Sequence, residues 1–205
     1  MGRSPIKLVH GIRRLPWRDN PMTPLLRELD ERELPAALVE YGYVLVPVSN
    51  RRAVTQIKDQ AELGCTLVGY SNGGWAVTQV AELGLPVHHL VLISPALHVG
   101  HAFPENVEHI SVFFSKGDRT GAAARKWRWA TRVMPWRWDN PHGWGAMMRD
   151  GYAGSDPRVR QFQMPDEVGH SWHQHRREVA NIADRIEEVA GMRGQSERIT
   201  HAVLP

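Results

Sequence analysis

The chain alternates short apolar runs with segments in which apolar residues recur at helical spacing. Most of the apolar runs are typical of buried strands, and the last one, near the C-terminus, is typical of an edge strand. The predicted strands are residues 6–9, 43–48, 65–68, 89–94, 109–115 and 159–164. Strands of this kind separated by helices indicate an α/β three-layer sandwich with a mostly parallel sheet of about six strands.

Helical spacing of apolar residues predicts helices over 51–63, 72–83, 119–133 and 173–192. A further helical pattern starts with Thr23 as the N-cap and extends to Leu38, with a break or a second start at Pro35. The polar tail beyond Gly194 is expected to be frayed. We assign residues 1–205 to a single domain, in which 119–160 form a helical and irregular, lid-like insertion before the last strand.

The most specific motif is Gly69-Tyr70-Ser71-Asn72-Gly73, a G-x-S-x-G turn between a predicted strand and a predicted helix. Such a turn holds the serine at its apex, with Oγ clear of the sheet, and the flanking glycines make room for it. The N–H of Asn72 would then point at an oxyanion formed beside Ser71. A glycine-rich turn with a spectator serine is the alternative reading of the motif taken alone.

A serine hydroxyl needs a base that accepts its proton and an acid that orients the base. Asp118 and His170 each follow a predicted strand, as Ser71 does. Because the carboxyl ends of parallel strands meet at one edge of a sheet, we expect these three side chains to lie together there. The order Ser, Asp, His along the chain is the one that α/β-hydrolases use.

Other residues compete for these roles. Asp166 is too close to His170 along the chain to fit the usual geometry of the acid, and Cys65, inside a strand, is a poor candidate nucleophile. His173 and His175 are expected on the following helix, pointing away from the site. Asp118 and His170 are therefore the preferred partners of Ser71.

Over nearly its whole length the chain resembles the α/β-hydrolase superfamily. The matching segments are 8–11, 69–73, 92–95, 115–118 and 169–171. The resemblance implies that Ser71 is the nucleophile, that His170 is general base and then acid, and that Asp118 orients His170. It also implies an oxyanion hole made by the N–H groups of Ile12 and Asn72. Unlike larger members, the chain starts at the strand before the first oxyanion loop and carries its extra material between the acid and the histidine.

Tryptophan and basic residues are concentrated in the segment between the acid and the histidine. Trp136, Trp138 and Trp144 from this segment, together with Tyr70, are candidate substrate-binding residues. The aromatic side chains suit three roles: a layer packed on the sheet, a substrate cleft or lid, or a contact with a protein or a membrane surface.

The composition changes this interpretation little. One cysteine excludes an internal disulfide framework, and neither a signal peptide nor an apolar run long enough to span a bilayer is present, so we expect a cytoplasmic protein. The net charge of +3 permits contact with an anionic surface, but no nucleic-acid-binding motif is present and we expect no nucleic-acid partner. The pattern does not indicate an oligomeric state.

We therefore predict a serine hydrolase that cleaves a small-molecule carboxylic ester through an acyl-enzyme, as a carboxylesterase or lipase does. The alternatives are a thioesterase or amidase with the same triad, and a non-catalytic binding module that uses the Trp/Arg-rich segment. We expect no cofactor and no metal, because the histidines at 170–175 lack a carboxylate at metal-ligand spacing.

Overall fold

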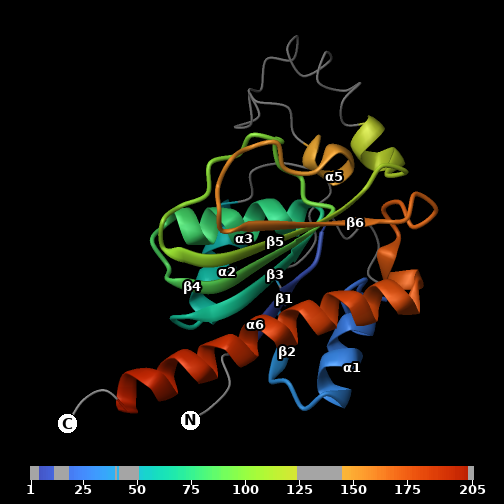
Figure 1. The fold of residues 1–205 in the computed structure, drawn as a ribbon. Coiled ribbons are helices and arrows are strands. Elements are labelled where there is room, and N and C mark those ends of the chain that lie inside the picture. The colour runs from blue at the N-terminus through green and yellow to red at the C-terminus, as the bar shows by residue number, and fades with distance from the viewer. Residues whose placement is uncertain (1–4, 12–18, 40, 42–50, 124–144, 203–205) are drawn as a thin grey trace.

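A six-stranded sheet lies at the centre of the computed structural model, which describes residues 5–11, 19–39, 41, 51–123 and 145–202 (Figure 1). All its pairings are parallel, and the strand order is β2-β1-β3-β4-β5-β6. The strands are β1 (Ile6–Val9), β2 (Ala36–Val39), β3 (Cys65–Tyr70), β4 (Val87–Ile93), β5 (Val107–Ser115) and β6 (Val159–Met164). The predicted parallel α/β sheet is confirmed.

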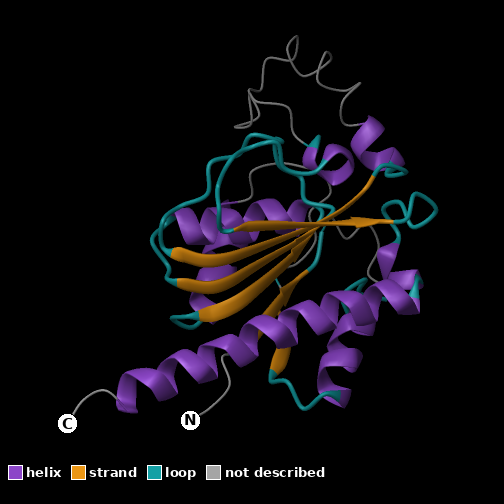
Figure 2. Cartoon of the chain, viewed as in Figure 1, coloured by secondary structure: helices purple, strands orange, loops and turns teal. Residues whose placement is uncertain are grey.

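Helices cover both faces of the sheet, which gives the predicted three layers (Figure 2). α1 (Thr23–Glu31) and α6 (Arg176–Ala202) lie on one face, and α2 (Arg51–Gln60) and α3 (Asn72–Glu82) lie on the other. The short helix α5 (Met147–Asp150) contacts β5 on the α3 side, and a 3-10 turn, η1 (Trp172–Gln174), precedes α6.

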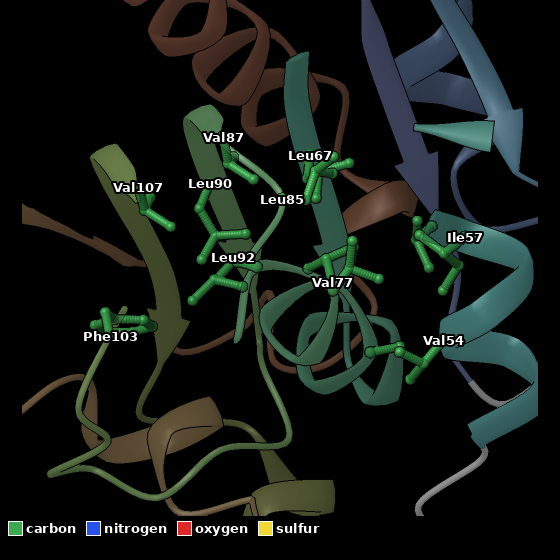
Figure 3. Packing of buried hydrophobic residues seen from close by; sticks show 14 of the residues in the cluster. Val54, Ile57, Leu67, Val77, Leu85, Val87, Leu90, Leu92, Phe103 and Val107 are labelled. Carbon is green, nitrogen blue, oxygen red and sulfur yellow. The ribbon is translucent and has the colours of Figure 1, made fainter. Parts of the chain in front are cut away.

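The side chains of β3 show why this strand must be buried on both faces. Cys65 and Leu67 pack into the cluster beneath α2 and α3, whereas Val68 and Tyr70 pack toward α1 and α6. Figure 3 shows the first cluster, to which Leu67 of β3 and Val77 of α3 both belong. Since successive side chains of a strand point to opposite faces, a strand covered on both sides is apolar throughout.

The first helix differs from the prediction. Thr23 is its first helical residue, not its N-cap, which is Met22. The helix ends at Glu31, and Glu33 then adopts a left-handed backbone with φ of 56°. The predicted helical continuation to Leu38 is wrong, because residues 36–39 form β2 and pair with β1 in parallel register.

Other boundaries also differ. The predicted strand at 43–48 lies outside the described residues, and of the predicted helix 119–133 the described part, 119–123, is helical. The tail expected to fray is helical as far as Ala202 at the end of α6. Within the described part of the chain, no helix is both long enough and apolar enough to span a membrane.

Candidate active site

Ser71 lies at the turn between β3 and α3, and its backbone has an unusual conformation. Its φ of 56° and ψ of −121° lie in a region that glycine favours and other residues rarely adopt. Neighbouring backbone fixes this turn. The Ser71 N–H donates to the Ile93 carbonyl at 2.9 Å, and the Ser71 carbonyl accepts from Gly74 N at 3.0 Å and Ala96 N at 2.9 Å. The conformation of Ser71 is therefore held by β4 and its following loop as well as by α3.

Two glycines allow the turn to form. A Cβ on Gly69 would lie 2.5 Å from Val77 Cγ2, and one on Gly73 would overlap the carbonyl oxygens of Val9 and His10. Real Cβ atoms do not approach other atoms this closely, so both positions require glycine. These contacts press the turn against the end of β1, where Gly11 also lies beside Ser71.

Ser71, His170 and Asp118 form a continuous chain of hydrogen bonds. Ser71 Oγ lies 3.1 Å from His170 Nε2, and His170 Nδ1 lies 2.8 Å from Asp118 Oδ2. An ionised carboxylate only accepts, so Nδ1 carries a proton and donates to Asp118 while the Nε2 lone pair accepts from the serine hydroxyl. The structure thus brings together the three side chains whose meeting the sequence predicted.

The side chain of the acid, Asp118, is more deeply buried than that of the base, His170. The Asp118 side chain is fully buried, whereas the His170 side chain is 21% exposed. The other carboxylate oxygen of Asp118 accepts the backbone N–H of Gly121 at 2.9 Å, so both of its oxygens have donors. A buried carboxylate with two donors remains in one orientation and stabilises positive charge on the imidazole.

The loops that carry Asp118 and His170 are tied to each other. The Ser115 hydroxyl donates to the Pro165 carbonyl at 2.9 Å. A Cβ on Gly117 would overlap the backbone of Asp166, so only glycine permits the two loops to pack this closely. Asp166 itself is exposed and contributes its backbone to this contact. The acid and the base are thus positioned relative to each other by backbone packing.

Tyr70 connects the serine turn to the histidine loop. Its hydroxyl donates to the backbone carbonyl of His170 at 2.8 Å, and its ring lies 5.0 Å from the His170 ring. Burial raises the pKa of Tyr70, and the charge of Asp118 raises it further, so the hydroxyl keeps its proton. The substrate-binding role of Tyr70 stays a prediction, and the hydrogen bond to His170 adds a role in positioning that residue.

Trp172 anchors the same loop from its other side. This side chain has no exposed surface and meets the ring of Tyr70 edge-on at 5.9 Å. His173 was expected on the following helix but lies in η1, before α6. Its ring meets the ring of Tyr70 edge-on at 6.2 Å. Burial lowers the pKa of His173, and the neighbouring His170 and His175 lower it further, which favours the neutral ring.

The loop after β1 is held by a residue that sequence reasoning missed. The Tyr41 hydroxyl donates to the carbonyl of His10 and lies 3.1 Å from that of Gly11, and the Tyr41 ring stacks on His10 at 4.4 Å. Of the two expected oxyanion donors, Asn72 is the first residue of α3, where N–H groups lack acceptors within the helix. Ile12 lies outside the described residues.

The other predicted substrate-binding residues also lie outside the described residues. They are Trp136, Trp138 and Trp144.

Among the described residues, one cluster has the composition of a metal site, and it consists of His88, Glu108 and His109. It contains no member of the triad. The chemistry that the described site supports is therefore that of Ser71 and its two partners.

Comparison with known proteins identifies the fold. No protein-family model matches the chain, and no curated protein sequence matches it. Among solved structures, similarity extends to a Xanthomonas campestris protein assigned to the alpha/beta hydrolase superfamily, with 17% identity over 91% of this chain and 99% of that one, at a TM-score of 0.50.

Two further solved structures have the same arrangement. The ydeN gene product of Bacillus subtilis is 15% identical over 91% of this chain and 98% of that one, with a TM-score of 0.52. Est1E of Butyrivibrio proteoclasticus, solved with ferulic acid, is 12% identical over 92% and 90% of the two chains, also with a TM-score of 0.52. The chain has the fold of the α/β-hydrolase superfamily.

Proposed function

We propose that the protein is a serine hydrolase that cleaves carboxylic esters through an acyl-enzyme. The observation that carries this proposal is the hydrogen-bonded chain from Ser71 Oγ through His170 to Asp118, with distances of 3.1 and 2.8 Å. A spectator serine has no need of a base within reach or of a buried acid behind that base. The turn that holds Ser71 in a strained conformation supports the same conclusion.

In the acylation step, the Ser71 hydroxyl transfers its proton to His170 Nε2 as Oγ attacks the ester carbonyl carbon. The carbonyl oxygen becomes an oxyanion, and we assign its stabilisation to the N–H of Asn72, the first residue of α3. His170 then gives its proton to the departing alkoxide, which leaves as the alcohol. The acyl group remains bound to Ser71 Oγ. The charge on the imidazolium is balanced by Asp118.

Deacylation repeats these proton transfers with water. His170 accepts a proton from water, and the resulting hydroxide attacks the acyl carbon. When the second tetrahedral intermediate collapses, His170 returns the proton to Ser71 Oγ and the carboxylic acid is released. Free enzyme is thereby restored with no other reactant.

Two considerations favour an ester over the other acyl substrates of such a triad. Ferulic acid, which is bound in the Est1E structure, is a carboxylic acid and so the acyl half of an ester. An alkoxide is also a better leaving group than an amide nitrogen, so a triad without further acid assistance cleaves esters more readily. Thioesters require the same steps and are distinguished by assay.

A fluorophosphonate probe tests the nucleophile without knowledge of the substrate, because it reacts with an activated serine. We expect stoichiometric labelling of the wild type and none of Ser71→Ala. Ser94→Ala is the matched control, since Ser94 is also buried and follows a neighbouring strand, but its hydroxyl has no hydrogen-bond partner among the described residues. An unlabelled, folded wild type would contradict the proposal and favour the binding module.

The substrate class is then tested with p-nitrophenyl esters of increasing acyl length beside matched thioesters and anilides. We expect turnover of the esters to exceed that of the anilides, and Ser71→Ala to abolish it. Faster turnover of thioesters than of every ester would retain the serine mechanism and reassign the substrate.

A further inference from the structure

Two histidines and a glutamate meet at the amino ends of β4 and β5, the opposite end of the sheet from Ser71. His88 belongs to β4, and Glu108 and His109 belong to β5. One ligating atom from each lies within 4.8 Å of the others. Figure 3 labels Val87 and Val107, the paired residues that directly precede His88 and Glu108, on neighbouring strands.

The contacts of His88 place unusual demands on its ring. The side chain is 3% exposed, with Nε2 at 3.3 Å from the Val189 carbonyl of α6 and Nδ1 at 2.8 Å from Glu108 Oε2. A carbonyl only accepts, so the tautomer with its proton on Nε2 donates to Val189 and leaves the Nδ1 lone pair facing the carboxylate of Glu108. In that tautomer Nδ1 and Oε2 are two electron-pair donors 2.8 Å apart, as two ligands of one cation are. In the other tautomer Nδ1 donates its proton to Glu108 and no ion is needed.

The surroundings of His88 are those of a metal ligand. Metal-binding histidines typically donate the other ring N–H to a carbonyl or carboxylate, which fixes the tautomer, and the Val189 carbonyl has this position. His109 supplies a third donor, with its ring edge-on to that of His88 at 5.3 Å. The nearby cation Arg185 is paired with Glu188 at 2.5 Å, which reduces its repulsion of a bound ion.

We propose that His88, Glu108 and His109 bind a divalent transition-metal ion of the Zn²⁺ type. Two imidazoles and a carboxylate suit Zn²⁺, Co²⁺ or Ni²⁺, whereas Ca²⁺ and Mg²⁺ prefer ligand sets made of oxygen. Three protein ligands leave a coordination position for water or another donor. The ion links β4 and β5 directly, and α6 through Val189, so it stabilises the fold without taking part in hydrolysis.

The binding test uses the full-length chain without a histidine tag, stripped of metal with a chelator and titrated with ZnCl₂ by calorimetry. We expect one high-affinity ion per chain. In Glu108→Gln and in His109→Asn we expect affinity to fall by at least the roughly tenfold to hundredfold that loss of an outer-shell partner causes. These two side chains are more exposed than His88, so their variants are expected to fold. Far-UV circular dichroism verifies folding, and Co²⁺ substitution gives visible d–d bands if nitrogen ligands bind.

His101→Asn is the matched control. His101 also pairs with a glutamate, Glu82, at 3.2 Å, but no third metal-binding side chain joins that pair among the described residues. We expect this variant to bind Zn²⁺ as the wild type does. Free Zn²⁺ at about 100 times its Kd should raise the melting temperature of the wild type by roughly 5 to 10 °C.

Absence of Zn²⁺ binding by the wild type would overturn the proposal and identify the contact as a hydrogen bond from His88 to Glu108. Equal affinity in the wild type, Glu108→Gln and His109→Asn would overturn it as well, by assigning the ion to other side chains. Fluorophosphonate labelling of Ser71, measured in the same samples, is expected to be unaffected by Glu108→Gln. Failure of the metal proposal is thereby distinguished from failure of the hydrolase proposal.

Discussion

Replacement of Asp118 by asparagine alters the proton arrangement of the site while it keeps the shape of the side chain. Gly121 N donates to Asp118 Oδ1 at 2.9 Å, so the amide oxygen of the asparagine takes that position. The amide NH₂ then faces His170 Nδ1 and donates to it. The ring proton is forced onto Nε2, where it points at Ser71 Oγ, and the imidazole can no longer accept the serine proton.

The expected loss follows from this tautomer. In a serine protease triad the same exchange lowers kcat about 10⁴-fold, equivalent to about 5.5 kcal/mol of transition-state stabilisation. Because every hydrogen bond of Asp118 keeps a partner in the variant, we expect the free energy of unfolding to change by only about 1 kcal/mol. The variant thus separates chemistry from folding.

The assay measures initial rates of p-nitrophenyl ester hydrolysis and, independently of substrate, the rate of fluorophosphonate labelling. Urea unfolding of the same samples reports stability. Asp166→Asn is the control, because Asp166 lies four residues before His170 but its side chain is exposed. Activity of Asp118→Asn within about tenfold of the wild type, or an equal loss in Asp166→Asn, would contradict the assigned role of Asp118.

Four further substitutions give distinct expected outcomes. Tyr70→Phe removes the hydrogen bond to the His170 carbonyl, so we expect kcat to fall roughly tenfold with KM nearly unchanged, measured by ester kinetics. Gly117→Ala places a methyl group against the Asp166 backbone and should cost about 2 kcal/mol in urea unfolding. The pKa of His173 is lowered from 6.5 in the folded state, so the unfolded chain binds the proton more readily and stability falls as the pH drops below 6.5. His173→Gln should therefore show a shallower loss of unfolding free energy between about pH 7.5 and pH 5.5. Ser71→Gly relieves the backbone strain and should gain about 1 kcal/mol in unfolding free energy while it loses all labelling.

The core strands could be predicted because burial on both faces requires them to be apolar throughout. β1 and β6 have the predicted bounds, and β3 extends two residues beyond its predicted end. Ser71, Asp118 and His170 could be predicted as a group because each lies in the turn or loop after a strand. β2 was missed because Leu34, Ala37 and Leu38 have helical spacing, whereas an edge strand with few buried side chains leaves little alternation to detect. Its place is set by pairing with β1, which is a tertiary interaction.

The supporting contacts of the site could not be predicted for a related reason. Tyr70 meets the carbonyl of a residue 100 positions away, and Tyr41 meets one 31 positions away. Nothing in the local pattern around either tyrosine specifies such a partner. The functional side chains leave a signal in their spacing, whereas the residues that orient them become apparent only when distant loops are brought together.

The backbone at Ser71 carries an evolutionary consequence. With a φ of 56° the fold alone favours glycine at this apex, so random mutation and drift would move the position toward glycine in any lineage that no longer needs the hydroxyl. Relatives in which the apex has become glycine should prove both inert and harder to denature. If the proposed hydrolase activity is correct, a serine at this apex is kept for its hydroxyl although the backbone favours glycine.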